Sequence, residues 1–178
     1  MIPAIIDVEA SGFGAGSYPI EVGVVLSDRT THCYLIQPEA EWTHWSAEAE
    51  SLHGISRELL MEKGQPAREV GECLNRILLG QTVYSDAWNY DFSWVGKLYD
   101  AAELLQGFRI DSLRSILTHP QLEAWDNTRE LVEAELSLRR HRASSDAMII
   151  QTVFDRTSAS GSELPTIKAS ENVRRPSY

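Results

Sequence analysis

Residues 2–8 read IPAIIDV, a short apolar run rich in β-branched residues, and Glu9 follows directly. Such a run predicts a strand that is buried on both faces at its start. Side chains at positions i and i+2 of a strand point to the same side, so Asp7 and Glu9 are expected to project together from the end of the strand. Two adjacent carboxylates repel each other unless a cation lies between them, and oxygen ligands favour Mg²⁺ or Mn²⁺. Two solvated acids at a strand end are the simpler interpretation of this pair alone.

The segments that follow predict an antiparallel three-strand meander. Residues 12–19 (GFGAGSYP) are typical of a turn, and residues 20–27 and 31–38 read as the second and third strands. Asp28-Arg29 is expected to form the hairpin turn between them.

Helices and short strands alternate after the meander. We expect helices over 46–62 with a break at 53–55, then over 66–79, 90–102, 112–117, 127–138 and 145–156, and strands over 81–86 and 108–111. This order predicts an α/β domain in which helices pack on a mixed sheet.

Composition and charge limit the class of protein. With 178 residues, 43% hydrophobic and 24% charged, the chain fits one soluble domain over residues 1–156, and residues 157–178 read as a polar tail that is flexible or docks on a partner. The net charge of −10 argues against a protein that coats long nucleic acid. No signal peptide or membrane span is expected, and the two cysteines match no metal spacing. A cytoplasmic location is the resulting expectation.

A second acidic segment, residues 84–91 (YSDAWNYD), lies where a short strand is expected to pass into a helix. Ligand sites of α/β folds occur at such places. Asp86 could cap the helix, whereas Asp91 lies inside it, where its carboxylate could reach back across the edge of the sheet.

A third segment joins a histidine to an acid. Ser144 or Ser145 is a natural N-cap, which leaves His141 in the preceding loop and Asp146 in the first turn of the helix. A histidine on a loop can act as a general base, since imidazole titrates near neutral pH. A surface histidine among arginines is the simpler interpretation of this segment alone.

Together these segments resemble the DEDDh (DnaQ-like) family of 3′-5′ exonucleases, which has the RNase H-like fold with helices on both faces of the sheet. The Asp-x-Glu motif of that family resembles Asp7 and Glu9. The Asp that follows an aromatic residue resembles Asp91 after Tyr90, and the His-x-x-x-x-Asp motif resembles His141 and Asp146. The resemblance covers roughly residues 2–155.

The resemblance implies catalysis by Asp7, Glu9, Asp91, His141 and Asp146. It implies that the four carboxylates hold two divalent ions, Mg²⁺ or Mn²⁺, and that His141 takes a proton from water. The chain departs from the family at Val8 and Ala10, where Thr is common, and at Asp86-Ala87, where His-Asn is usual. These departures concern substrate contacts.

The resemblance also places the terminal nucleotide near Gly12, Leu52 and His53. In the plain alternative, Gly12 makes a turn and Leu52 packs in the core, and the sequence leaves both open. Tryptophan rings could stack on bases or fill the core, and Trp88 lies nearest to Asp91.

The expected activity is removal of nucleoside 5′-monophosphates from short or single-stranded 3′ ends. RNA is slightly favoured over DNA, because a compact acidic chain is more similar to oligoribonuclease and RNase T than to a proofreading subunit. The rival hypotheses are a non-catalytic adaptor that binds a protein partner and an endonuclease on the same fold. The sequence leaves open whether the chain forms a homodimer.

Overall fold

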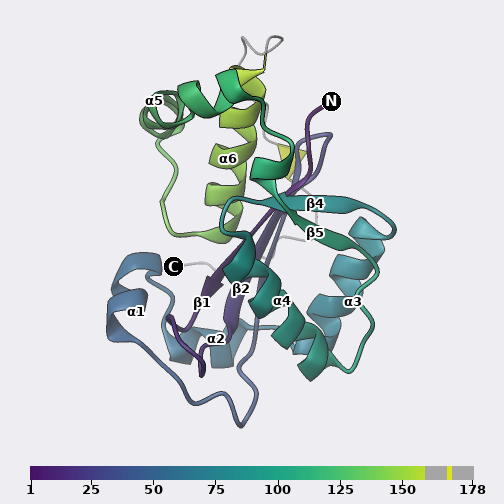
Figure 1. The fold of residues 1–178 in the computed structure, drawn as a ribbon. Coiled ribbons are helices and arrows are strands. Elements are labelled where there is room, and N and C mark those ends of the chain that lie inside the picture. The colour runs from purple at the N-terminus through teal and green to yellow at the C-terminus, as the bar shows by residue number, and fades with distance from the viewer. Residues whose placement is uncertain (159–167, 170–178) are drawn as a thin grey trace.

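The computed structural model describes residues 1–158 and 168–169. Its mixed sheet has the strand order β5-β4-β1-β2-β3-β6 (Figure 1). The strands are β1 (Ile5–Ala10), β2 (Pro19–Val25), β3 (Thr30–Leu35), β4 (Thr82–Ser85), β5 (Arg109–Ser112) and β6 (Lys168–Ala169). The helices are α1 (Ala47–His53), α2 (Arg57–Lys63), α3 (Ala67–Leu78), α4 (Trp88–Ala102), α5 (His119–Leu136) and α6 (Ala143–Thr157), with a 3₁₀ turn, η1, at Leu113–Ser115.

The sheet is the predicted antiparallel meander extended by parallel strands. β1 pairs antiparallel with β2, and β2 pairs antiparallel with β3. β4 pairs parallel with β1, and β5 pairs parallel with β4. Helix α6 covers one face of the sheet with α5 packed against it, and α3 and α4 lie on the other face (Figure 1). The predicted α/β class with helices on both faces is confirmed.

Strand β1 lies between the two layers of helices. Its side chains alternate, so they pack in turn against one layer and the other. Ile6 and Val8 pack into the apolar cluster on the side of α3 and α4, whereas Ile5 packs with residues of α6. Since side chains alternate along a strand, Asp7 and Glu9 lie on the same side as Ile5, facing α6. The predicted common orientation of the two acids therefore follows from the observed packing.

Several predicted boundaries were wrong, including the following three. The first strand runs from Ile5 to Ala10 and not over residues 2–8, so Glu9 lies within it. Helix α5 begins at His119 and not near Asn127, because Thr118 and Gln121 form a capping box. Helix α6 begins at Ala143, with Arg142 at the N-cap position that was predicted for Ser144 or Ser145.

The start of α6 packs directly on β2 at Gly23. A Cβ atom at position 23 would lie 2.2 Å from the Ala143 carbonyl carbon and 2.2 Å from the Ser144 backbone nitrogen. The fully buried Glu21 fixes the same turn. It accepts hydrogen bonds from the Ala143 N–H at 2.8 Å and from Arg142 Nη2 at 2.6 Å. These contacts hold the first turn of α6, which carries Asp146, against the central strands.

Gly23→Ala is expected to destabilise the fold by about 1–3 kcal/mol, because backbone atoms of α6 must move away from the added methyl group. Gly96→Ala is the matched control. No atom lies within 4 Å of a Cβ at position 96, which lies inside α4, so this change should stabilise by roughly 0.5–1 kcal/mol. Urea denaturation measures both. Equal stabilities for the two variants would contradict the proposed close packing.

Two further sequence-based predictions concern the polar tail, residues 157–178, and membrane spans. Most of the predicted tail, residues 159–167 and 170–178, lies outside the described residues. Within the tail, β6 pairs parallel with β3 through Thr30↔Lys168 and Thr31↔Ala169. Among the described residues, every helix is too short or too polar to cross a membrane.

Candidate active site

The two acids of β1 lie in a crowded, half-buried position. Asp7 is opposite Gly23 on β2, and Glu9 is directly opposite Glu21. Burial, followed by repulsion from Asp91 and Glu9, raises the pKa of Asp7 well above its ordinary range. Burial, followed by repulsion from Asp146 and Glu21, raises the pKa of Glu9 to about 7. Asp7 and Glu9 are therefore surrounded by other carboxylates.

Asp91 reaches this cluster from the first turn of α4. Its side chain is buried, with 1% exposed, and Oδ2 accepts a short hydrogen bond from the Ser85 hydroxyl at the end of β4. Burial raises the pKa of Asp91 against the opposing effect of that hydrogen bond. Among charged groups, Asp91 has the largest effect on the pKa of Asp7. The predicted reach of Asp91 across the sheet edge agrees with these contacts.

Asp146 comes from the first turn of α6, as predicted, and both of its oxygens accept hydrogen bonds. Arg140 Nε donates to Oδ1 at 2.9 Å, and the His141 backbone N–H donates to Oδ2 at 3.0 Å. His141 has a φ of 57°, a left-handed conformation that few non-glycine residues adopt. This conformation belongs to the turn that directs the His141 N–H at the carboxylate.

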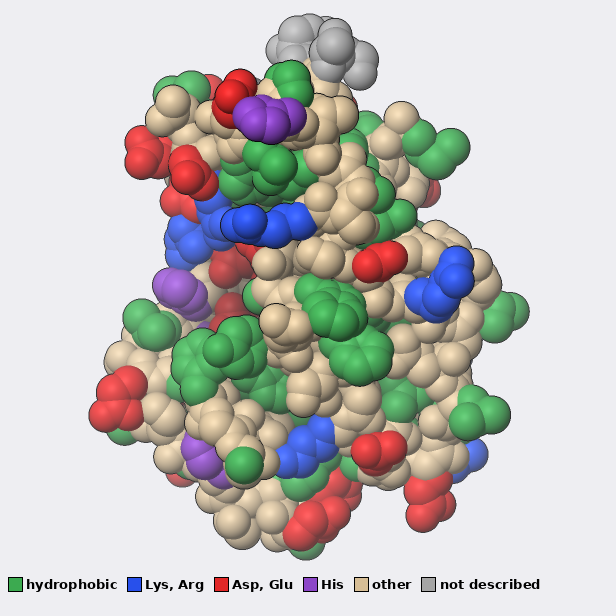
Figure 2. Space-filling view, in the orientation of Figure 1, with side chains coloured by type: hydrophobic (Ala, Val, Ile, Leu, Met, Phe, Trp, Pro, Cys, Tyr) green, Lys and Arg blue, Asp and Glu red, His purple; other side chains and the backbone are tan. Residues whose placement is uncertain are grey.

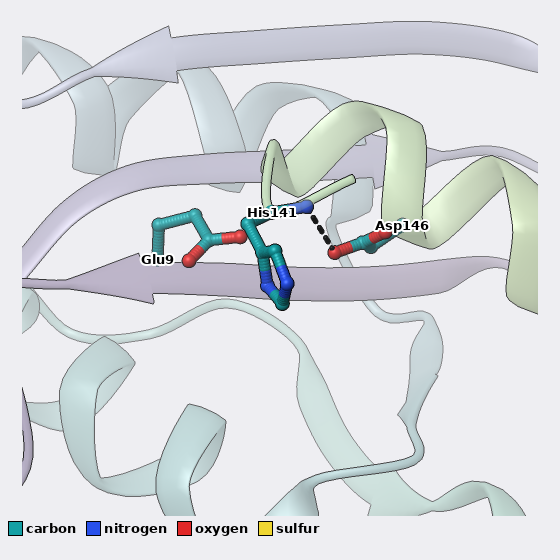
Figure 3. A group of neighbouring side chains, drawn as sticks. All are labelled: Glu9, His141 and Asp146. Carbon is teal, nitrogen blue, oxygen red and sulfur yellow. Dashed lines mark hydrogen bonds between the residues drawn. The ribbon is translucent and has the colours of Figure 1, made fainter. Parts of the chain in front are cut away.

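His141 also brings its imidazole to the carboxylates. One ligand atom from each of Glu9, His141 and Asp146 lies within 4.8 Å of the others. Figure 3 shows the three side chains side by side. The three side chains come from β1, from the loop before α6 and from α6 itself. The structure thus brings Glu9, His141 and Asp146 together by direct distance. Asp91 lies near enough to Asp7 that its charge, after burial, raises the pKa of Asp7.

The donor atoms fit divalent cations. Carboxylate oxygen atoms are the ligands that Mg²⁺ and Mn²⁺ prefer. A cation between these carboxylates would remove the repulsion that, after burial, raises the pKa values of Asp7 and Glu9. His141 is placed either to complete a coordination shell or to accept a proton beside it.

A chain of alternating charges joins the second and third acidic segments through α5. Asp86 pairs with Arg129 at 3.1 Å, and Arg129 pairs with Glu133 at 2.9 Å. Glu133 then pairs with Arg140 at 2.5 Å, and Arg140 with Asp146 at 2.9 Å. Sequence analysis missed Arg129 and Glu133, and it did not predict the ion pairs of Arg140. The i,i+4 spacing of Arg129 and Glu133 was the available signal. Asp86 does not cap α4, because the N-cap position is Ala87.

The residues predicted to bind the terminal nucleotide have different surroundings. Gly12 lies in a turn with a φ of 138°, and a Cβ there would lie 2.8 Å from His44 Cε1. Leu52 is 57% exposed, so the alternative that placed it in the core is wrong. His53 is buried, its Nδ1 accepts a hydrogen bond from the Ile55 N–H at 3.0 Å, and its Nε2 has no partner among the described residues.

Exposed aromatic rings lie on the first turns of α4 and on the loop after β1. Phe13 and Tyr90 are exposed and meet edge to face at 5.3 Å between ring centroids. Trp88 packs on Phe92 and donates its indole N–H to the Ile110 carbonyl at 3.0 Å. In Figure 2, acidic side chains lie in a recess between basic side chains on one side and hydrophobic ones on the other.

The raised pKa of Asp7 gives a prediction for the metal-free protein. A carboxyl with a raised folded-state pKa binds its proton more tightly when folded, so stability is lost as pH rises through that pKa. Asp7→Asn should therefore raise the melting temperature at pH 8, by about 2–4 °C for each kcal/mol gained, and leave it nearly unchanged at pH 4. Thermal melts in EDTA measure this. A variant less stable than the parent at pH 8 would contradict it.

Comparisons with known proteins give the fold but no sequence family. Neither a protein-family model nor a curated protein matches the sequence. The structure of E. coli Exonuclease I in complex with a dA16 oligonucleotide is similar, with a TM-score of 0.65 and 12% identity over 86% of this chain and 40% of that chain. The zinc-bound form of the E. coli Exonuclease I complex with single-stranded DNA has a TM-score of 0.62 and 12% identity over 86% and 39%.

Exonuclease I from Methylocaldum szegediense has a TM-score of 0.59 and 13% identity over 88% of this chain and 40% of that chain. The chain thus spans about 40% of the length of these structures. At such low identity the likeness concerns the fold. It confirms the predicted RNase H-like α/β class.

Proposed function

We propose that this protein is a metal-dependent 3′-5′ exonuclease that removes nucleoside 5′-monophosphates from single-stranded 3′ ends. One observation carries the proposal. A ligand atom from each of Glu9, His141 and Asp146 lies within 4.8 Å of the others, and burial together with neighbouring carboxylates raises the pKa of Asp7 and Asp91, a repulsion that bound cations would relieve. The similar solved structures, which include Exonuclease I with bound oligonucleotides, support the same reaction class.

Asp7, Glu9, Asp91 and Asp146 would hold the divalent ions. Bound ions would supply positive charge that stabilises the charge developing during phosphodiester hydrolysis. His141 takes the proton of the attacking water, whose oxygen forms a bond to the terminal phosphorus. The bond from phosphorus to the 3′ oxygen of the preceding nucleotide breaks, and that oxygen leaves with a proton from solvent. The His141 N–H and Arg140 keep Asp146 oriented throughout.

A single strand is the substrate that the surroundings of the site favour. The exposed rings of Phe13 and Tyr90 offer faces for unpaired bases, and stacking of this kind is tolerant of sequence. The net charge of −10 favours a short contact with the strand over a long tract. RNA is slightly favoured over DNA by the compact acidic chain, while the similar solved structures hold DNA.

The test is digestion of 5′-labelled RNA and DNA oligomers with Mn²⁺, read as product ladders. The proposal expects shortening by one nucleotide at a time from the 3′ end, and complete inhibition by excess EDTA. Full activity in EDTA would overturn the metal mechanism.

The same assay distinguishes the two rival functions, a non-catalytic adaptor and an endonuclease. A non-catalytic adaptor would release no nucleotide from any oligomer with either metal. An endonuclease would cut a circular single strand, which offers no 3′ end. Release of mononucleotides from linear strands, with circles left intact, excludes both.

A further inference from the structure

The run of arginines beside the site divides into two kinds. Arg140 forms ion pairs with Glu133 and Asp146, and Arg142 forms an ion pair with Glu21. Both guanidinium groups are thus committed to carboxylates that shape the site. Arg139 is exposed and has no hydrogen bond or ion pair with any described residue.

Arg139 lies against the turn that ends α1. A Cβ atom built on Gly54 would lie 2.0 Å from Nη2 of Arg139 and 3.2 Å from its Cζ. The guanidinium can occupy this place only because residue 54 is glycine, whose φ of 65° forms the C-cap of α1. Arg139 therefore extends from the loop that carries His141 to the segment that carries Leu52 and His53.

We propose that Arg139 binds a non-scissile backbone phosphate of the nucleic-acid strand, and this inference rests on the proposed exonuclease function. The carboxylates of the site repel a polyanion, so a cation beside them is needed to draw the strand in. An arginine without a carboxylate partner offers a planar fork of donors that matches a phosphate. Arg140 and Arg142 cannot do this without releasing Asp146 or Glu21.

The location of Arg139 fits such a contact. His141 is two residues along the same loop, so a strand whose terminal phosphodiester lies at His141 passes Arg139 with a neighbouring phosphate. The backbone at Gly54 gives the guanidinium a firm support on one side, which lowers the loss of side-chain freedom when the phosphate binds.

The experiment measures binding without turnover. Fluorescence anisotropy follows a 5′-fluorescein octathymidylate with a 3′-terminal phosphorothioate, in Mn²⁺, on a His141→Ala background that lacks the base. Arg139→Gln is expected to raise Kd roughly 10-fold. It should also reduce the slope of log Kd against log salt by about 0.7, the contribution of one phosphate in a single strand. Arg139→Lys should keep the slope, because it keeps the charge.

Arg76→Gln is the matched control. Arg76 is an exposed arginine in the last turn of α3, so its removal makes the same change in net charge away from the site. It should leave the slope unchanged. All variants should keep the melting temperature of the parent, since Arg139 and Arg76 are both on the surface.

The outcomes separate the inference from the proposed function. Octamer binding that is equal in the parent and in Arg139→Gln, with equal salt slopes, would overturn the role of Arg139 and leave the exonuclease proposal standing. A parent protein that binds neither the octathymidylate nor the matching octauridylate in Mn²⁺ would overturn the exonuclease proposal, and the role of Arg139 with it.

Discussion

Asp91→Asn is expected to reduce turnover by 10³-fold or more, an order-of-magnitude figure for loss of a catalytic metal ligand. The amide keeps the size of the side chain but removes the charge that would hold a cation. Asp91 is also buried, so solvent cannot compensate for the loss of the carboxylate charge. The measurement is the initial rate of mononucleotide release from a labelled oligomer.

Asp86→Asn is the control for this prediction. Asp86 lies five residues before Asp91 and pairs with Arg129 at the start of the charge chain through α5, with a partly exposed side chain. Its loss should lower turnover far less. An inactive Asp86→Asn protein together with an active Asp91→Asn protein would show that the second acidic segment has been assigned to the wrong residue.

The losses of turnover caused by substituting the individual carboxylates should not be additive. Burial and then the charge of Asp91 raise the pKa of Asp7, so the two carboxylates belong to one electrostatic unit. A double variant, Asp7→Asn with Asp91→Asn, is therefore expected to be little slower than either single variant.

His141→Ala should lower kcat by about 10²–10⁴-fold, the usual contribution of a general base, while Mn²⁺ binding is largely kept. The reason is that four carboxylates remain to hold the ions. Calorimetric titration with Mn²⁺ measures whether metal binding is kept. His119→Ala, which removes an exposed histidine at the start of α5, should change neither quantity.

The structure makes this test informative. The imidazole of His141 lies close enough to Glu9 and Asp146 to serve as a metal ligand as well as a base. Loss of one Mn²⁺ site in His141→Ala would recast His141 as a ligand and require another proton acceptor.

The features that follow local rules were predictable from sequence. Alternation along β1 placed Asp7 and Glu9 on one side, and the helix start after His141 placed Asp146 in a first turn. These inferences need only the period of a strand and the geometry of a helix. The roles of these residues remain predictions.

The features that depend on tertiary packing were not predictable. The partners of Arg140 come from α5 and α6, and no local pattern specifies which carboxylate a long side chain will reach. Leu52 was open to a core assignment because hydrophobicity alone does not say which face of a short helix meets the rest of the molecule. The start of α5 was missed although Thr118 and Gln121 carry a local capping signal.

The anchoring of α6 has a consequence for how the protein is made. Glu21 is 121 residues from Arg142 and 122 residues from Ala143 in the chain. The candidate active site can therefore form only when nearly the whole domain has been synthesised. Contacts between such distant segments form late in folding. A ribosome-bound or proteolysed fragment that ends before residue 143 carries Asp7, Glu9 and Asp91 but lacks Asp146. The proposed nuclease is therefore expected to be inert until residue 146 has been synthesised and α6 has packed on β2.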